Sequence, residues 1–319
     1  MRRRGVAVLA ALTFGALAGS CSADKITAAG ESGVWKAGTA AHAVVVSSLD
    51  RTYLLHVPPD KRLNSASIPV PYPLVIVLHG SSGSASSIEE TSGMDSLADA
   101  QAFLVAYPNG TGGDFNLYPS DWNAGTCCGG ANRDNVDDLG FLAALITEVS
   151  AQVPVDARRV YVTGFSAGGR MAYHAGCQLS TTIAAIAVVE GSLVDDACTP
   201  TKPVALWAVH GTDDAEVLYD EDAPPPPGDV PALADSLPPA VQFWTALNGC
   251  TTGTLTATSD HVGHTSFTSC TGADVSFYSI DGGTHGWPGG PDDPGSQPPM
   301  NEMKASVLMW QFLVRHVRK

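Results

Sequence analysis

The segment Val160–Tyr173, VYVTGFSAGGRMAY, places the tightest constraint on what this chain can fold into. Its first four residues are apolar or β-branched and predict a buried strand, and a helix-forming run follows the motif G-x-S-x-G at 164–168. A strand, a sharp turn and a helix around this motif form the context in which the central serine acts as a nucleophile. Gly164 and Gly168 suit a turn so tight that a Cβ there would collide with neighbouring backbone. Ser166 is therefore our candidate nucleophile, and a glycine-rich turn in another α/β fold is the alternative.

Charge that develops beside the Ser166 hydroxyl needs hydrogen-bond donors, and the sequence offers two backbone amides. The amide of Ala167 follows the candidate nucleophile at the positive end of the new helix. The second donor is expected in the loop after the apolar run Leu74–Leu78, where the Ser81 amide is our first choice. We interpret His79 in that loop as a brace for the loop rather than as a proton carrier.

A serine hydroxyl is a weak nucleophile at neutral pH, so Ser166 needs a base within hydrogen-bond reach. In an open parallel sheet such a group lies on a loop at the carboxyl end of a strand. His285 follows the apolar run Val275–Ile280 in a glycine-rich loop that would let its ring turn toward the serine, and it is our candidate base.

The base needs an orienting carboxylate, and the segment HGTDD at 210–214 offers two directly after an apolar run. Asp213 and Asp214 would point in different directions, and spacing alone does not choose between them. Asp281 is a third option, and His210 is interpreted as a residue that shapes the aspartate loop. The order Ser, Asp, His along the chain is that of the α/β-hydrolase fold.

A chain of 319 residues that is 44% hydrophobic can bury a large core. Apolar runs alternate with helical patterns, which implies right-handed crossovers and one mostly parallel sheet. We predict the α/β class, with a mostly parallel central sheet, helices on both faces and a single domain. The expected strands are an edge pair within Ala41–Val57, then Leu74–Leu78, Phe103–Tyr107, Val160–Thr163, Ile183–Val189, Val204–Val209 and Val275–Ile280, and the expected helices are 87–100, 137–153, 240–247 and 303–314.

Two stretches have no regular pattern. The long loop Thr111–Asn135 is rich in glycine, asparagine and cysteine, and loops of this length inside a compact domain are usually functional. The proline-rich stretch Glu221–Pro239 is interpreted as a surface insertion or cap.

The beginning of the chain is typical of a signal for export. Three arginines at 2–4 precede the apolar run Gly5–Gly19, which is too short for a stable membrane span. Cys21 follows a sequence that resembles a lipoprotein cleavage box, and ordinary cleavage after Ala18 is the alternative. We expect a signal peptide at 1–21, a flexible tether at 22–40 and the folded domain at 41–319.

The formal net charge of −15 argues against a nucleic-acid partner and against adhesion to anionic lipid. Membrane attachment is therefore expected only through lipid on Cys21, and the protein is expected to be a monomer.

Six cysteines remain after Cys21, and an even number in an exported chain predicts disulfides. Cys250 and Cys270 bracket a short segment rich in threonine and serine, and we expect them to close a hairpin-like loop. Cys177 and Cys198 lie at the end of one helix and just before the next strand, and are a second candidate pair. The adjacent residues 127 and 128 either bridge each other or remain thiols. The cysteine spacing does not suggest a metal site.

Seven motifs together resemble the polyhydroxybutyrate depolymerase and feruloyl esterase group of secreted α/β-hydrolases. They are LHG at 78–80, AYPNG at 106–110, WNAGTCCG at 122–129, DDLGF at 137–141, GFSAGGRMAY at 164–173, HGTDD at 210–214 and THGWPGG at 284–290. The resemblance implies a nucleophile at Ser166 and a base at His285, and its H-G-T-x-D pattern selects Asp214. It also implies that Trp122 and Trp287 flank the acyl or aromatic part of an ester, with loop packing as the alternative.

These observations predict an exported serine carboxylic-ester hydrolase that works through an acyl-enzyme and needs no cofactor or metal. The substrate stays open among polyesters, feruloyl esters, and acetylxylan or other plant-wall esters. A peptidase on the same fold is the rival within enzymes, and an exported binding lipoprotein is the rival outside them.

Overall fold

The computed structural model describes residues 36–59, 70–112, 120–290 and 300–319. The chain divides into the units Met1–Gly30 and Glu31–Lys319, and every described residue lies in the second. The expected signal peptide and most of the expected tether lie outside the described residues. The first strand begins at Gly38, so the last residues of the expected tether belong to the sheet.

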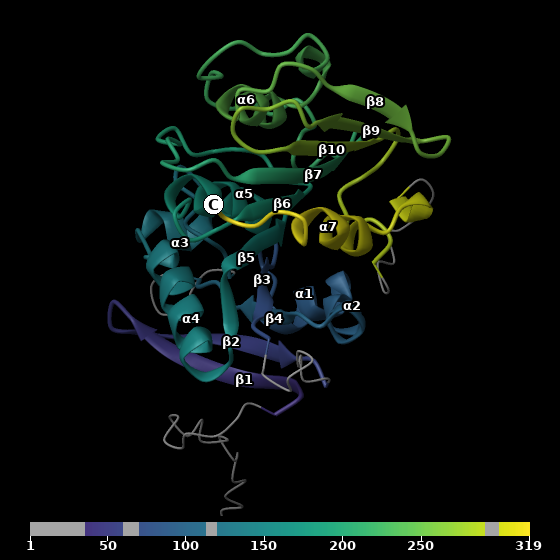
Figure 1. The fold of residues 1–319 in the computed structure, drawn as a ribbon. Coiled ribbons are helices and arrows are strands. Elements are labelled where there is room, and N and C mark those ends of the chain that lie inside the picture. Colours follow the sequence, from purple (N-terminus) through teal and green to yellow (C-terminus); the bar gives the residue numbers. More distant parts are fainter. Residues whose placement is uncertain (1–35, 60–69, 113–119, 291–299) are drawn as a thin grey trace, which may run out of the picture. The chain divides into compact units, whose positions relative to one another are not determined.

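A ten-stranded sheet, in the order β1-β2-β4-β3-β5-β6-β7-β10-β9-β8, forms the centre of the described part (Figure 1). The strands β4, β3, β5, β6, β7 and β10 are parallel neighbours, and antiparallel strands extend the sheet at both edges. The strands are β1 Gly38–Val46, β2 Leu49–Val57, β3 Tyr72–Leu78, β4 Leu104–Pro108, β5 Val155–Phe165, β6 Ala185–Val189, β7 Ala205–Gly211, β8 Thr254–Ala257, β9 Val262–Phe267 and β10 Val275–Ile280.

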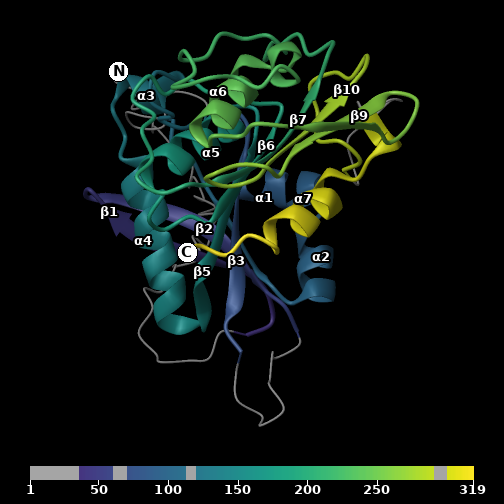
Figure 2. The same ribbon diagram turned by 45° about the horizontal axis from the view of Figure 1, so that its top comes forward.

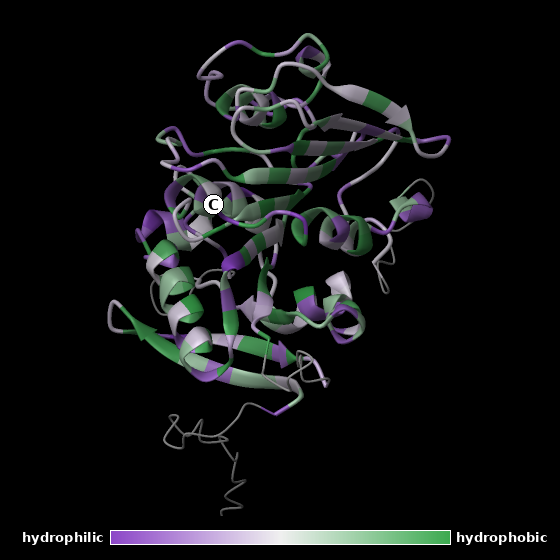
Figure 3. Cartoon of the chain, viewed as in Figure 1, coloured by the Kyte–Doolittle hydropathy of each residue, from purple (hydrophilic) through white to green (hydrophobic). Residues whose placement is uncertain are grey.

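Local sequence explains both the inner strands and the edge hairpin. Every residue of β3, β4, β6 and β7 is buried, as expected for short apolar runs covered on both faces. Ser47 and Ser48 join β1 to β2 with φ of 50° and 68°, the left-handed pair that a two-residue hairpin turn requires. In Figure 3 hydrophobic residues colour much of β6 and β7, whereas every residue of β8 is exposed.

Helices cover both faces of the sheet, as predicted. One apolar cluster packs side chains of α4, α5 and α6 on one face, and a second packs α1, α2 and α7 on the other (Figure 2). The helices are α1 Ala85–Ser92, α2 Met94–Gln101, α3 Gly129–Arg133, α4 Asp138–Gln152, α5 Ala167–Gln178, α6 Pro239–Leu247 and α7 Ala305–Leu313.

The structure differs from the sequence prediction in three elements. The single helix expected at 87–100 is two helices, because Gly93 takes a φ of 58° that ends α1 and starts α2. The loop 111–135 contains the short helix α3, and residues 113–119 of it lie outside the described residues. The hairpin-like loop expected between Cys250 and Cys270 is a hairpin, but it consists of two regular strands, β8 and β9, which continue the sheet past β10.

The disulfides join Cys177 to Cys198, Cys250 to Cys270, and Cys127 to Cys128. Both long-range pairs follow the sequence prediction, and the adjacent cysteines bridge each other. In the described ranges, no helix has the length and apolar character needed to cross a membrane.

Candidate active site

Ser166 occupies a strained turn between β5 and α5. Its φ is 56° and its ψ is −120°, a combination that a non-glycine residue adopts only when its surroundings enforce it. The turn is fixed by hydrogen bonds from the Ser166 amide to the Val189 carbonyl at 3.0 Å and from the Arg170 amide to the Ser166 carbonyl at 3.0 Å. A Cβ on Gly164 would lie 2.2 Å from the carbonyl oxygen of Gly168, so the predicted need for glycine is met.

The loop after β3 lies directly against the serine. A Cβ on Gly80 would come within 3.3 Å of the Ser166 Cβ, so the two backbones approach closely. Within the described ranges, the amides of Ser81 and Ala167 have no hydrogen-bond partner. The amide donors predicted for an oxyanion are thus both uncommitted, and they belong to the two loops that meet at Gly80 and Ser166.

His79 braces this loop from inside, as the sequence suggested. Its Nδ1 donates to the Gly80 carbonyl at 2.7 Å, and its Nε2 accepts from the Gly110 amide at 2.9 Å. Burial lowers the pKa of His79, which keeps the ring neutral. Because both nitrogens are used inside the protein, His79 holds the loop and has no nitrogen left for proton transfer to a ligand.

Asp121 is a part of this loop system that sequence reasoning missed. Its carboxylate accepts from the Ser81 hydroxyl at 3.0 Å and from the Trp122 amide at 3.0 Å. It therefore ties the loop after β3 to the loop that contains α3. The sequence signal was weak, since a single aspartate before a tryptophan resembles many loop residues.

Asp214 and His285 come together from the loops after β7 and β10. The Asp214 Oδ2 lies 2.7 Å from the His285 Nδ1, and the Asp214 Oδ1 accepts from the amides of Glu216 and Val217, both at 2.9 Å. Burial alone would raise the pKa of Asp214, but hydrogen bonds from His210, His285 and the two amides lower it below its ordinary value. The carboxylate is therefore ionised at neutral pH.

The neighbouring aspartates do not share this position. Asp213 is exposed, and its amide donates to the Gly283 carbonyl at 2.8 Å, which holds the two loops together. Asp281 is also exposed. The sequence pattern alone allowed Asp213, Asp214 or Asp281 as the acid that orients the base. Of these three, Asp214 is the one that contacts His285.

The His285 ring lies beside the turn that carries Ser166. Its centroid is 4.7 Å from that of the Phe165 ring, the residue before Ser166. Its Nδ1 faces Asp214, whereas its Nε2 makes no hydrogen bond to any described residue and lies 3.8 Å from the exposed carboxylate of Glu216. In particular, Ser166 and His285, both described, are not joined by a hydrogen bond. Such bonds are often long without substrate and tighten when it binds.

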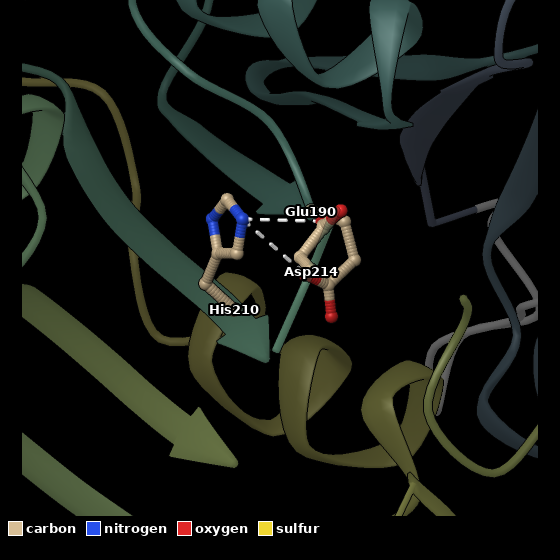
Figure 4. Close-up of side chains that lie close together, drawn as sticks. All are labelled: Glu190, His210 and Asp214. Atoms are coloured by element: carbon tan, nitrogen blue, oxygen red, sulfur yellow. Dashed lines mark ion pairs between the residues drawn. The ribbon is translucent and has the colours of Figure 1, made fainter. Parts of the chain in front are cut away.

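Glu190 is a second residue that sequence reasoning missed, and Figure 4 shows it facing His210 and Asp214. One ligand-type atom from each residue lies within 4.8 Å of the others, and all three side chains are buried. The signal in the sequence was a lone carboxylate directly after the all-apolar strand β6.

This donor set fits a metal poorly. The His210 Nε2 lies 2.8 Å from the Val217 carbonyl, which can only accept, so this nitrogen carries a hydrogen and offers no lone pair. The Asp214 oxygen on the same side is used by His285. We therefore assign this cluster to hydrogen bonding rather than to coordination.

Trp122 and Trp287 do not lie where the resemblance placed them. Their exposed fractions are 0% and 1%, and their indole N–H groups donate to the His79 carbonyl and the Ser306 hydroxyl. A buried indole with a satisfied N–H packs the loops, so the expectation that these rings contact substrate is corrected.

Arg170 links α5 to two loops. Its guanidinium binds both carboxylate oxygens of Glu221 at 2.7 Å, donates to the Ser192 hydroxyl at 3.1 Å and lies 3.4 Å from the Cys127 sulfur. The proline-rich segment is thus fastened at its start to α5.

The strand order, with the Ser166 turn after β5 and the Asp214–His285 pair after β7 and β10, defines the class: this is an α/β-hydrolase-fold protein. Residues 51–219 match the family model described as Esterase PHB depolymerase. The chain belongs to this family, and it is by class a carboxylic-ester hydrolase.

Similar proteins agree with this assignment. A putative esterase, NocK of Nocardia uniformis subsp. tsuyamanensis, is 30% identical over 80% of this chain and 75% of its own length. Feruloyl esterase B of Piromyces equi is 33% identical over 56% of this chain, which spans only 33% of that relative. Among solved structures, an acetyl xylan esterase from Aspergillus awamori matches with a TM-score of 0.55 at 14% identity, covering 77% of this chain and 94% of its own, which shows the fold alone.

Proposed function

We propose that this protein is an exported serine esterase in which Ser166, His285 and Asp214 form the catalytic triad. The observation that supports this most is the 2.7 Å hydrogen bond that the His285 Nδ1 donates to Asp214. It fixes the tautomer in which Nδ1 carries the hydrogen and Nε2 has a lone pair to accept a proton. That lone pair lies on a ring packed beside the nucleophile turn.

The reaction follows from these positions. The Ser166 oxygen attacks the ester carbonyl while the His285 Nε2 takes the hydroxyl proton, and Asp214 stabilises the imidazolium. The amides of Ala167 and Ser81 donate to the oxyanion of the tetrahedral intermediate. The imidazolium returns the proton to the leaving alcohol, and water activated by the same ring then hydrolyses the acyl-enzyme. General-base catalysis of this kind contributes about 10²–10⁴-fold, and removing one oxyanion donor costs on the order of 10²-fold.

The proposed substrate is an ester bond in a polyester or in a plant cell-wall polymer. Two observations support these substrates. Relatives are named feruloyl esterase and acetylxylan esterase, and the matching family model is described as Esterase PHB depolymerase. Because both tryptophans are buried, aromatic specificity would come from other side chains of the rim.

Export is supported by the arginines and apolar run at the start of the chain and by the three disulfides. Mass spectrometry of the first peptide of the mature protein separates lipid on Cys21 from free secretion. Size-exclusion chromatography of the mature protein tests the expected monomer.

The proposal is tested with a panel of p-nitrophenyl acetate and butyrate, methyl ferulate, acetylated xylan and hydroxybutyrate oligomers. The wild type should hydrolyse at least one, and Ser166→Ala should lower kcat by about 10⁴-fold or more. Equal rates for the two proteins, or no hydrolysis of any ester by the wild type, would overturn it.

A further inference from the structure

Glu190 is buried beside the proposed triad without a role in the reaction. It directly follows β6 and takes a φ of 49°, a left-handed conformation that is strained for glutamate. Its amide donates to the Val209 carbonyl at 3.1 Å, and its exposed fraction is 0%. Its carboxyl oxygens accept from the Gly211 amide at 3.2 and 3.0 Å.

The titratable groups around Glu190 are Asp214, His210, His285 and Tyr219. Asp214 is a second carboxylate within 4.8 Å, and burial together with this neighbour raises the pKa of Glu190 well above its ordinary value. The His210 Nε2 lies 3.5 Å from Glu190 and 3.3 Å from Asp214, and the Val217 carbonyl at 2.8 Å is its nearest acceptor. His285 is engaged by the Asp214 Oδ2, and Tyr219 contacts the His210 ring.

Two carboxylates sealed in one site repel each other unless they share a proton. Asp214 already accepts two amides and the His285 N–H, so it is the better place for the negative charge. We propose that Glu190 is a positioning residue that stays protonated and donates a hydrogen bond to the Asp214 carboxylate. This inference rests on the proposed function, because it assigns Glu190 a part in holding the acid of the triad.

The test compares Glu190→Gln, which keeps a neutral donor of similar shape, with Glu190→Leu, which removes the donor. Glu190→Gln should retain kcat within about threefold. This change is smaller than the loss of one hydrogen bond would cause. Glu190→Leu should lower kcat by about 10-fold to 100-fold with little change in KM, as expected for a lost bond to a charged group. Without the donor Asp214 attracts protons more strongly, so the acid limb of kcat/KM should move to higher pH.

Infrared difference spectra give a readout that does not depend on activity. The wild type should show the C=O stretch of a protonated carboxylic acid at neutral pH, and Glu190→Gln should lose it. Glu216→Gln, a change at an exposed side chain, should keep the band. A wild type without the band, or Glu190→Gln as impaired as Glu190→Leu, would show an ionised Glu190 and overturn the inference. If Ser166→Ala stayed active the proposed function would fail, while the band would still decide the protonation state.

A second, independent observation is a cavity with a basic lining at the amino ends of β7 and β10. It has a volume of about 610 Å³ and is lined by Ala205 and Val275, the first residues of β7 and β10. Asp214 and His285 follow the other ends of these two strands. The cavity therefore belongs to neither the proposed triad nor its loops.

Positive charge gathers around this cavity although the chain has a net charge of −15. Within the described residues, one acidic side chain lines it, Asp274, whose carboxylate lies 3.3 Å from the His316 Nε2. The side chains of Lys202 and Arg315 make no hydrogen bond or ion pair to any described residue. The basic lining residues are Lys202, Arg315, Arg318 and Lys319.

The cavity also has apolar walls beside its basic lining residues. The Arg318 Nη2 donates to the Ala157 carbonyl at 3.1 Å, whereas its Nε is buried without a partner. The Phe312 ring and the His264 ring line the same space. A cavity of this size with a few convergent polar groups suits a small organic molecule.

From charge, volume and lining together, we infer that the cavity binds a small organic carboxylate with an apolar body. Calorimetric titration with cinnamate should show saturable binding, whereas cinnamamide, which lacks the charge, and inorganic phosphate, which lacks the apolar body, should bind at least about tenfold more weakly. Arg315→Glu should weaken cinnamate binding by about tenfold or more.

Lys36→Glu is the matched control, since it makes the same charge change at an exposed residue that does not line the cavity. It should leave cinnamate binding intact, and Lys202→Glu replaces Arg315→Glu if the latter does not fold. Absence of saturable binding, unchanged binding in the cavity variant, or phosphate bound as tightly as cinnamate would each overturn the inference.

Discussion

His56 and His285 both contact aspartates, and they differ in how many of their ring nitrogens are engaged. His56 in β2 uses both ring nitrogens, with Nδ1 3.1 Å from Asp95 and Nε2 2.8 Å from Asp99. His285 uses only Nδ1, and its Nε2 makes no hydrogen bond to a described residue. A histidine held at both nitrogens can stabilise a fold but cannot take a proton from a substrate or nucleophile, whereas one held at Nδ1 alone can.

The most direct test of this difference is to remove the imidazole ring of each histidine in turn. His285→Ala should lower kcat on the responsive ester by about 10⁴-fold or more, because it removes the base. His56→Ala should keep kcat within about threefold, because its effect is confined to local hydrogen bonds. Steady-state kinetics on folded protein, checked by circular dichroism, measures both. A comparable loss of kcat in the two variants would show that the number of engaged nitrogens does not separate the roles.

The next largest effect is expected at the aspartates. Asp214→Asn should lower kcat by about 10³–10⁴-fold, because the amide no longer fixes the tautomer with a lone pair on Nε2. Asp213→Asn is the matched control one residue away and should change kcat less than about threefold, since its side chain is exposed. If the control lost more activity than Asp214→Asn, the choice between the two carboxylates would be reversed.

Local sequence was enough to predict the framework of the site. The turn at Ser166 depends on glycines at fixed positions, and the Cβ clash at Gly164 is a property of that segment alone. The inner strands could be found because parallel strands covered on both faces are continuous apolar runs. The pairing of Asp214 with His285 follows once strand order brings β7 beside β10.

Local sequence could not predict that the side chains of Trp122 and Glu190 are buried. Trp122 sits in a polar, glycine-rich loop and was expected to flank the ester, but the loop folds back so that its indole reaches the His79 carbonyl. Glu190 is charged and follows a strand, which by itself predicts an exposed loop residue. Only the packing of β6 beside β7 places it next to His210 and Asp214.

The contacts of His56 with Asp95 and Asp99 should affect the stability of the protein rather than its catalysis. Hydrogen bonds from His56, Tyr107 and Thr39 outweigh the effect of burial and lower the pKa of Asp95 to about 2. A lowered carboxyl pKa adds stability that is present above the unfolded value and is lost as pH falls through the folded value. Asp95→Asn should therefore reduce the free energy of unfolding by about 1–2 kcal/mol at neutral pH, measured by urea denaturation.

Asp99→Asn serves as the comparison for that measurement. The Asp99 side chain is 44% exposed, so its pair with His56 should contribute less than about 0.5 kcal/mol. The difference between the two variants should shrink as the pH falls below about 4, where the unfolded carboxyl takes up a proton. Equal destabilisation by both changes would contradict the assignment of Asp95 as the main anchor.

A smaller effect than that of Asp95→Asn is expected from the pH dependence that His56 itself contributes. Burial lowers its pKa, but hydrogen bonds and charge from Asp95 and Asp99 raise it above the ordinary value. A raised histidine pKa contributes stability that is fully present below the unfolded value, about 6.5, and is lost as pH rises through the folded value. The wild type should therefore lose up to about 1 kcal/mol more than His56→Gln between about pH 6 and pH 8. Parallel pH profiles of the unfolding free energy would mean that His56 is neutral in this range and that its two aspartates act only as hydrogen-bond acceptors.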